Sequence, residues 1–406
     1  MRVVCLSAQG AELRQIYAAH AVEHIAWPEA GRYGPGVLAM ARDACAKVDD
    51  PAGIDCVVAE NLPMAPVAWQ LRELGYTGPI LLVPHVNPYP LRNFILVLLW
   101  MHIWGPSDVV VAGSPATANR YQTLFGMPAR AIPTYGVDES VFYPRAKSAA
   151  RRELGLSDRP MLLYTGRMAP DKNIGALLAA HRSVRELVPS AELIMAVTFR
   201  DEVYVRALAP QLGDVRIEEW AQPDRLAKLY SAADAFLSCA TSYYETYGRS
   251  PSEATACGAP SILPDWDGFP LCVGADGRLV PVDSLDIPLY DTWSYSMVNL
   301  PAVVSAVAEL LGSPPPQQCL DPMLSASTTA KALNGLLEEV VATATAGRRW
   351  TGVNAVQPGH PTVRQVVDIL GAADPERLRQ LATCTDDQLP FIDETVRRDL
   401  HRAQFE

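Results

Sequence analysis

The sequence predicts an α/β protein made of two doubly wound domains, each with a parallel sheet between helices. Short apolar segments alternate with helical patterns, and this alternation runs twice along 406 residues, which are too many for one ordinary domain. Strands that are covered on both faces are apolar throughout, as many of these segments are. The expected strands are residues 2–6, 55–59, 80–84, 109–112, 161–165, 192–196, 215–218, 235–238 and 259–263.

A charged segment, residues 144–160, separates the two sets of units and is interpreted as a linker. We therefore expect an N-terminal Rossmann-like domain over residues 1–145 and a C-terminal one over residues 146–345. Such sheets bind ligands at the carboxyl ends of their strands, so a facing pair would form one interdomain cleft. Residues 346–406 carry only helical patterns. This helical tail could pack back on the N-terminal domain, cap the cleft or form an oligomer contact, as in a homodimer.

Composition excludes several classes of function. The net charge of −11 and the absence of a dense basic block argue against nucleic acid as a partner and against membrane association by charge. The apolar run of residues 94–104 is shorter than the roughly 20 residues of a membrane-spanning helix, so we expect a buried helix there, with a greasy acceptor pocket or a monotopic surface as the alternatives. No signal peptide is expected at the N-terminus.

The eight cysteines are scattered and form no CxxC pair. Neither a disulfide framework nor a zinc site is expected, and a reducing, cytoplasmic location is the default. No cluster of carboxylates at a strand end predicts a metal, and no cofactor is expected.

The strongest chemical signal is YETYGRSPSEATACGAPSI, residues 244–262. Glu245 lies in a loop and Glu253 lies eight positions later on a helix. Gly248 lets the backbone approach a ligand, and the amides of the following helix N-terminus favour a diphosphate. Two glutamates at this spacing occur by chance on surface helices. Here, however, a strand precedes them, and a glycine stop and another strand follow.

This segment resembles the Glu-x7-Glu motif of the family 4 retaining glycosyltransferases, which are group 1 glycosyltransferases of the GT-B fold. The resemblance implies that Glu245 reaches the hydroxyls of the transferred sugar and that Glu253 binds the ribose of the donor nucleotide. It also implies that backbone amides of Thr246, Tyr247 and Gly248 hold the sugar and phosphate.

A second element, LYTGRMAPDKN over residues 163–173, is similar to the family's GRxxxxKG element. Gly166 is its glycine. Arg167 can form two hydrogen bonds to a phosphate and Lys172 adds a point charge, so both would stabilise the charge on a departing nucleotide diphosphate. Alone, this pair would be interpreted as exposed basic residues around a turn. The family's next glycine is Asn173 here, a residue that tolerates the same backbone conformations.

Three further features depend on the resemblance. Residues 131–144 resemble the IPNGVDxxxFxP signature, which we expect to be structural. His85 follows a strand and would lie near the anomeric centre of the donor, although a lone histidine there is more often structural. Gly10 would contact the donor phosphates, in a loop that has one glycine where the family has several.

The sequence departs from the family in two turns that border the donor pocket. VTFRD at residues 197–201 replaces a Gly-Asp-Gly-Pro turn, and DGFPLC at residues 267–272 replaces a Gly-Gly-x-x-Glu loop. The identity of the sugar therefore stays open.

The resemblance implies a retaining, metal-independent glycosyltransferase. A hexose-type sugar would move from a nucleotide-sugar donor (UDP, GDP or dTDP) to an acceptor, which the acidic charge favours as a soluble small molecule or saccharide. A GT-B nucleotide-sugar epimerase and a catalytically altered pseudo-glycosyltransferase are the alternatives. A nicotinamide dehydrogenase is rejected, because residues 31–36 lack both the order of a GxGxxG turn and a preceding strand.

Overall fold

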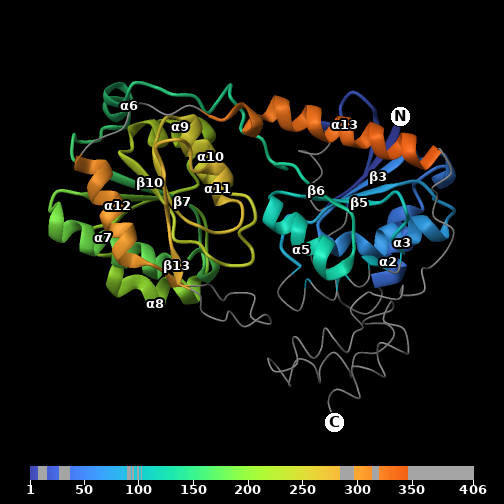
Figure 1. Cartoon of the computed structure of the whole chain (residues 1–406), viewed down its shortest axis with the longest axis horizontal. Helices are drawn as coiled ribbons and strands as arrows, with labels where there is room; N and C mark the ends of the chain where they lie inside the picture. Colours follow the sequence, from blue (N-terminus) through green and yellow to red (C-terminus); the bar gives the residue numbers. More distant parts are fainter. Residues whose placement is uncertain are drawn as a thin grey trace, which may run out of the picture. The chain divides into compact units, whose positions relative to one another are not determined.

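The structure, a computed structural model, describes residues 1–7, 16–26, 37–88, 93, 96–97, 100–101, 103–283, 297–312 and 320–345 (Figure 1). It divides into two compact units. The first unit holds the described residues up to Thr134 and from Ala330 onward, and the second holds those from Tyr135 to Thr329. Each unit is a parallel sheet between helices, which confirms the predicted α/β class.

The sheet of the first unit has the strand order β2-β1-β3-β4-β5-β6 among the described residues, and all neighbours are parallel. All four strands predicted in this half are present. The two unpredicted strands are at the edges, where partly exposed residues interrupt the apolar pattern. The strands are β1 (Arg2–Ser7), β2 (Ala21–Ala26), β3 (Cys56–Glu60), β4 (Ile80–Val83), β5 (Val109–Ala112) and β6 (Ala129–Ala131).

Helices cover both faces of this sheet (Figure 1). On one face, α2 (Val37–Cys45), α3 (Ala65–Glu73) and α5 (Pro115–Phe125) pack together with the short segment η3 (Leu62–Met64). Another short segment, η2 (Pro51–Gly53), precedes β3 and has no buried residue. Four described residues of the apolar run are buried in this core, as expected, namely Leu96, Val97, Trp100 and Ile103, and two more, Met101 and Trp104, pack against it partly buried.

The opposite face of the sheet is covered by α13 (Ala326–Thr345), whose Leu333, Leu337 and Val340 pack against Val3 and Val58. Residues up to 345 were expected in the C-terminal domain. The structure instead assigns most of this helix to the first unit, because its apolar stripe completes the N-terminal core. The expected helical tail, residues 346–406, lies outside the described residues.

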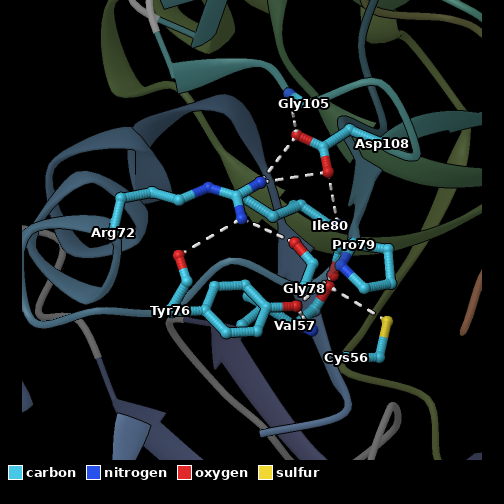
Figure 2. A network of polar contacts seen from close by, with 9 residues as sticks. All are labelled: Cys56, Val57, Arg72, Tyr76, Gly78, Pro79, Ile80, Gly105 and Asp108. Atoms are coloured by element: carbon cyan, nitrogen blue, oxygen red, sulfur yellow. Dashed lines mark hydrogen bonds and ion pairs between the residues drawn. The ribbon is translucent and has the colours of Figure 1, made fainter. Parts of the chain in front are cut away.

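A buried ion pair closes the amino ends of β4 and β5 (Figure 2). Arg72 on α3 donates to both carboxylate oxygens of Asp108, at 3.1 and 2.9 Å. Asp108 also accepts from the amides of Ile80 (2.7 Å) and Gly105 (2.6 Å), and Arg72 donates to the carbonyl oxygen of Gly78 (2.6 Å). The two charged side chains are 0% and 1% exposed. The charges are thus removed from water but surrounded by partners.

The sheet of the second unit has the order β12-β11-β10-β7-β8-β9, again with parallel neighbours. All five strands predicted in this half are present. The strands are β7 (Met161–Met168), β8 (Glu192–Arg200), β9 (Arg216–Glu219), β10 (Ala235–Leu237), β11 (Ser261–Pro264) and β12 (Arg278–Val280). A separate antiparallel pair is formed by β13 (Val282–Asp283) and β14 (Met297–Val298).

Helices α7 (Ile174–Leu187), α8 (Glu202–Leu212) and α12 (Leu300–Gly312) pack into one core of this unit. Helices α6 (Lys147–Leu154), α9 (Pro223–Ala232) and α10 (Arg249–Ala256) pack into the core on the other face. Shorter elements are η4 (Pro170–Lys172), α11 (Phe269–Cys272) and η5 (Pro322–Leu324).

The charged segment of residues 144–160 is not a free linker, because it contains α6. Ala150 and Leu154 are buried in the second core. Arg151 donates to the carbonyl oxygen of Ala232 (3.0 Å) and to Asp234 (2.6 Å). With only one short apolar stripe among many charges, this helix gives a weak sequence signal. The second unit begins at Tyr135, before the expected boundary at residue 146, so α6 lies inside it.

The family-like segment of residues 131–144 is structural, as expected. Its Val137 pairs with Ser325, where the chain enters and leaves the second unit. A Cβ atom on Gly136 would lie 2.4 Å from the Cα atom of Ala326, so only glycine allows these two backbones to approach.

Six cysteines in the described part of the chain are buried and form no disulfide bond with one another: Cys5, Cys45, Cys56, Cys239, Cys257 and Cys272. Within the same part, none of the helices is both long and apolar enough to cross a membrane.

Candidate active site

The candidate site of the second unit lies where β7 and β10 end. These strands are neighbours and run parallel, so the loops that follow them leave the same edge of the sheet. The loop after β7 carries the basic residues, and the loop after β10 carries the first glutamate. The topology therefore brings together two motifs that are some 70 residues apart in sequence.

Arg167 and Lys172 flank a fully buried carboxylate. Arg167 Nη2 donates to Asp171 Oδ2 at 2.5 Å, and Lys172 Nζ lies 3.7 Å from the same oxygen. Asp171 is 0% exposed, and its Oδ1 atom has no hydrogen-bond partner among the described residues. One buried negative charge thus holds two cations at the edge of the sheet, with the Arg167 side chain 38% exposed.

The residue that follows, Asn173, has φ 49° and ψ 47°, in the left-handed region. This confirms that asparagine takes the backbone conformation expected for the family's glycine. It allows the chain to turn from η4 into α7.

Lys172 also contacts the first glutamate of the Glu-x7-Glu segment. Its Nζ atom donates to Glu245 Oε2 at 2.6 Å, and both side chains are about 15% exposed. Such an arrangement leaves an ammonium and a carboxylate close to each other and reachable from solvent. A ligand that carries hydroxyl and phosphate groups can exchange with this pair.

Glu253 lies on α10 and is buried, at 7% exposure. Its Oε1 atom accepts from Arg249 Nε at 3.2 Å, and its Oε2 atom accepts from the hydroxyl of Tyr230 at 3.1 Å. Burial raises the pKa of Glu253 above its ordinary value of 4.5, while Arg249 and Tyr230 act in the opposite direction. Tyr230 in turn lies 2.6 Å from Thr165 Oγ1 on β7, which connects Glu253 to the strand that carries Arg167.

The turn between the two glutamates is tightly packed. Thr246 and Tyr247 are buried, and Cys272 Sγ lies 3.2 Å from the carbonyl oxygen of Tyr247. Gly248 has φ 108°, and a Cβ atom there would lie 3.0 Å from the Phe269 ring. Gly166, at the end of β7, also has positive φ, at 147°. Only glycine adopts these conformations without strain, so the turn is fixed by its sequence.

His85 lies in the first unit, just after β4. Its Nε2 atom is 3.1 Å from Glu60 Oε1, and its Nδ1 atom is 3.4 Å from Thr134 Oγ1. The His85 backbone has φ 56°, which is uncommon for a residue with a side chain. Gly10 lies outside the described residues.

The described residues contain no group of three or more His, Cys, Asp or Glu side chains that could hold a metal ion. The nearest cluster of charges, around Asp171, instead pairs carboxylates with cations.

Sequence reasoning missed three of the residues that shape this site. Asp171 stands between the two basic residues of the motif, so its position was a usable signal. Tyr230 and Thr165 carried none, because a tyrosine in an apolar helix and a threonine in a strand are typical core residues.

Comparisons with known proteins bear on the family and the fold. Residues 159–288 match the family model described as glycosyl transferases group 1. This part of the chain is similar to that family. The match covers both motifs and thus the whole candidate site of the second unit, but only part of the chain.

Relatives with a curated name include D-inositol 3-phosphate glycosyltransferase 2 of Catenulispora acidiphila, which is 33% identical over 187 residues, 42% of this chain and 43% of the relative. The D-inositol 3-phosphate glycosyltransferase of Segniliparus rotundus is 33% identical over 188 residues, 44% of this chain and 41% of the relative. The chain spans less than half the length of these relatives.

Solved structures establish the fold as GT-B. The sucrose-phosphate synthase of Thermosynechococcus elongatus has a TM-score of 0.59 at 20% identity, over 85% of this chain and 98% of that one. HepE of Anabaena, in complex with UDP and glucose, has a TM-score of 0.57 at 16% identity, over 85% of this chain and 100% of that one.

Proposed function

We propose that this protein is a retaining, metal-independent glycosyltransferase that takes a hexose-type sugar from a nucleotide diphosphate. The proposal is carried by one observation: Lys172 bonds to Glu245 at the carboxyl edge of the sheet, with Arg167 held beside it by Asp171. Two fixed cations beside a carboxylate that reaches the sugar would stabilise the negative charge that develops as the nucleotide diphosphate leaves.

The donor would bind the second unit. Its ribose would contact Glu253, its diphosphate would contact Arg167 and Lys172, and its sugar hydroxyls would contact Glu245. Amides of the turn at Thr246, Tyr247 and Gly248, together with Gly166, would hold the phosphate and sugar closely. The raised pKa of Glu253 supports this role, since a buried carboxylate gains from hydroxyl donors that a ligand brings.

The first unit would bind the acceptor. His85 would lie near the anomeric centre, fixed by Glu60 and Thr134, and Gly10 would approach the donor phosphates. The relatives are named for D-inositol 3-phosphate, so a small phosphorylated polyol is the first acceptor to test. Arg167 and Lys172 would take the place of a metal ion, because fixed positive charges stabilise the negative charge that develops on the departing phosphate.

Nucleotide sugars screened by thermal denaturation test the donor. UDP-glucose, UDP-N-acetylglucosamine, GDP-mannose and dTDP-glucose are added one at a time, with and without EDTA. A true donor at 100 times its Kd stabilises the fold by about 2.7 kcal/mol, which raises Tm, and the shift should persist in EDTA. Stabilisation by none of them, or only with a divalent cation, would contradict the proposal.

The stabilising donor is then incubated with and without inositol phosphate, and the product is analysed by NMR for its anomeric configuration. Transfer with retained configuration is the expected result. A new epimer of the donor without acceptor would instead identify an epimerase. Tight binding with no turnover over a panel of acceptors would identify a pseudo-glycosyltransferase.

A further inference from the structure

A chain of hydrogen bonds connects three elements behind the candidate ribose site. Thr165 on β7 lies 2.6 Å from the hydroxyl of Tyr230 on α9, and this hydroxyl lies 3.1 Å from Glu253 Oε2 on α10. All three side chains are buried, with Tyr230 at 0% exposure. None of the functions assigned above uses Thr165 or Tyr230.

The chemistry of the groups sets the direction of this chain. An ionised carboxylate can only accept hydrogen bonds, so the Tyr230 hydroxyl donates to Glu253. Tyrosine has one proton to give, and therefore its oxygen accepts from the hydroxyl of Thr165. Thr165 thus orients the Tyr230 proton, and Tyr230 orients the carboxylate.

Packing makes the tyrosine a rigid support. Its ring contacts the rings of Phe142 and Phe236, with centroids 6.2 and 6.0 Å apart. The second partner of Glu253 is Arg249, whose side chain is 59% exposed. Its surroundings therefore hold it less firmly than they hold Tyr230. The fixed donor to Glu253 is therefore Tyr230, and it leaves further lone pairs on both carboxylate oxygens for a ligand.

We propose that Tyr230 is a positioning residue for ribose recognition, which holds the Glu253 carboxylate so that its remaining lone pairs face the ribose hydroxyls of the donor. This inference rests on the proposed function. It assigns selectivity for a ribonucleotide to a residue that does not touch the nucleotide.

The test compares UDP with 2′-deoxy-UDP and 3′-deoxy-UDP by isothermal titration calorimetry, on the wild type and on Tyr230→Phe. The wild type should bind UDP about tenfold more tightly than the analogue that lacks the contacted hydroxyl, as the loss of one hydrogen bond to a charged group implies. In Tyr230→Phe this ratio should fall to about two, while the affinity for that analogue changes less than twofold. If the donor screen selects GDP, the same analogues of GDP are used.

Tyr17→Phe is the matched control. Tyr17 is also fully buried, it lies in the first unit, and its hydroxyl has no hydrogen-bond partner among the described residues. It undergoes the same chemical change and should keep the full ratio. Thr165→Val should also lower the ratio, by a factor of about three, which is less than the effect of Tyr230→Phe. This change removes only the hydrogen bond that orients the Tyr230 hydroxyl.

Outcomes separate the two hypotheses. A Tyr230→Phe variant that keeps the tenfold preference, or that weakens UDP and both deoxy analogues equally, overturns the positioning role. A wild type that binds no nucleotide in the screen overturns the proposed function itself. The Tm of each variant is measured alongside, so that a folding defect is recognised as a loss of all binding together with a lowered Tm.

Discussion

Two ion pairs, one in each unit, differ in their surroundings. The pair in the first unit is enclosed and serves the fold, whereas the pair in the second unit is partly exposed and is available to a ligand. The pair of Arg72 and Asp108 lies at the amino ends of β4 and β5, its side chains are 0% and 1% exposed, and neighbouring backbone groups surround both (Figure 2). Lys172 and Glu245 lie in the loops that follow the carboxyl ends of β7 and β10, 16% and 15% exposed. Ligands of doubly wound sheets bind at carboxyl ends, so the difference matches the difference in expected roles.

The buried carboxylates of the two units also differ in how many of their oxygens accept hydrogen bonds. Asp108 accepts four hydrogen bonds from Arg72 and two amides. Asp171, equally buried beside Lys172, has one oxygen that no residue in the described part of the chain contacts by a hydrogen bond. A carboxylate whose two oxygens are both bonded maintains a fold, whereas a buried carboxylate with an unbonded oxygen carries a desolvation cost that a ligand can offset.

Lys172→Ala should produce the largest effect. Transfer should fall by about 10³-fold or more, because the cation stabilises charge that develops only as the nucleotide leaves. The measurement is kcat with the donor that the screen selects. Lys228→Ala is the matched control: this lysine of the same unit pairs with Asp224 and Glu153 away from the motif, and its loss should leave kcat unchanged. Full activity in Lys172→Ala would refute the leaving-group assignment.

Asp108→Asn should act on stability alone. It leaves the Arg72 charge buried without its counter-charge, which costs about 3–5 kcal/mol. The urea midpoint should therefore fall, while kcat/KM of the folded protein in buffer stays within twofold. Asp214→Asn, which breaks the exposed pair with Arg185, should change stability by less than about 1 kcal/mol. An unchanged midpoint in Asp108→Asn would show that the comparison between the two pairs is wrong.

The sequence predicted the fold better than the internal geometry of the site. Nine apolar segments were enough to place nine strands, because burial on both faces leaves a strong pattern. Three of the four edge strands, β2, β6 and β12, were missed, since partial exposure and charge dilute that pattern. The positions of Arg167, Lys172, Glu245 and Glu253 could be anticipated from the motifs. Asp171, between the two basic residues of the motif, was a usable signal that was overlooked. The link through Tyr230 could not be anticipated, because it joins residues of β7, α9 and α10 that only the fold brings together.

The titration of Glu253 gives a test of whether this carboxylate serves the fold or a ligand. Burial raises its pKa above 4.5, so the folded protein takes up this proton more readily than the unfolded chain. Stability from this group is therefore present below the unfolded pKa and is lost as the pH rises through the folded pKa. Above the folded pKa the ionised, buried carboxylate destabilises the fold, and Glu253→Gln should raise Tm slightly while it weakens UDP binding about tenfold.

The same titration should appear in binding. As the pH falls through the raised pKa, the preference of the wild type for UDP over the deoxy analogue should diminish, because protonated Glu253 loses acceptor capacity. Protonation of the diphosphate affects both ligands equally and cancels in their ratio. Glu253→Gln should show a small ratio with no pH dependence. A wild-type ratio that stays constant from pH 8 down to pH 4.5 would mean that Glu253 does not carry the ribose contact, and the carboxylate would then belong with Asp108 as a structural group.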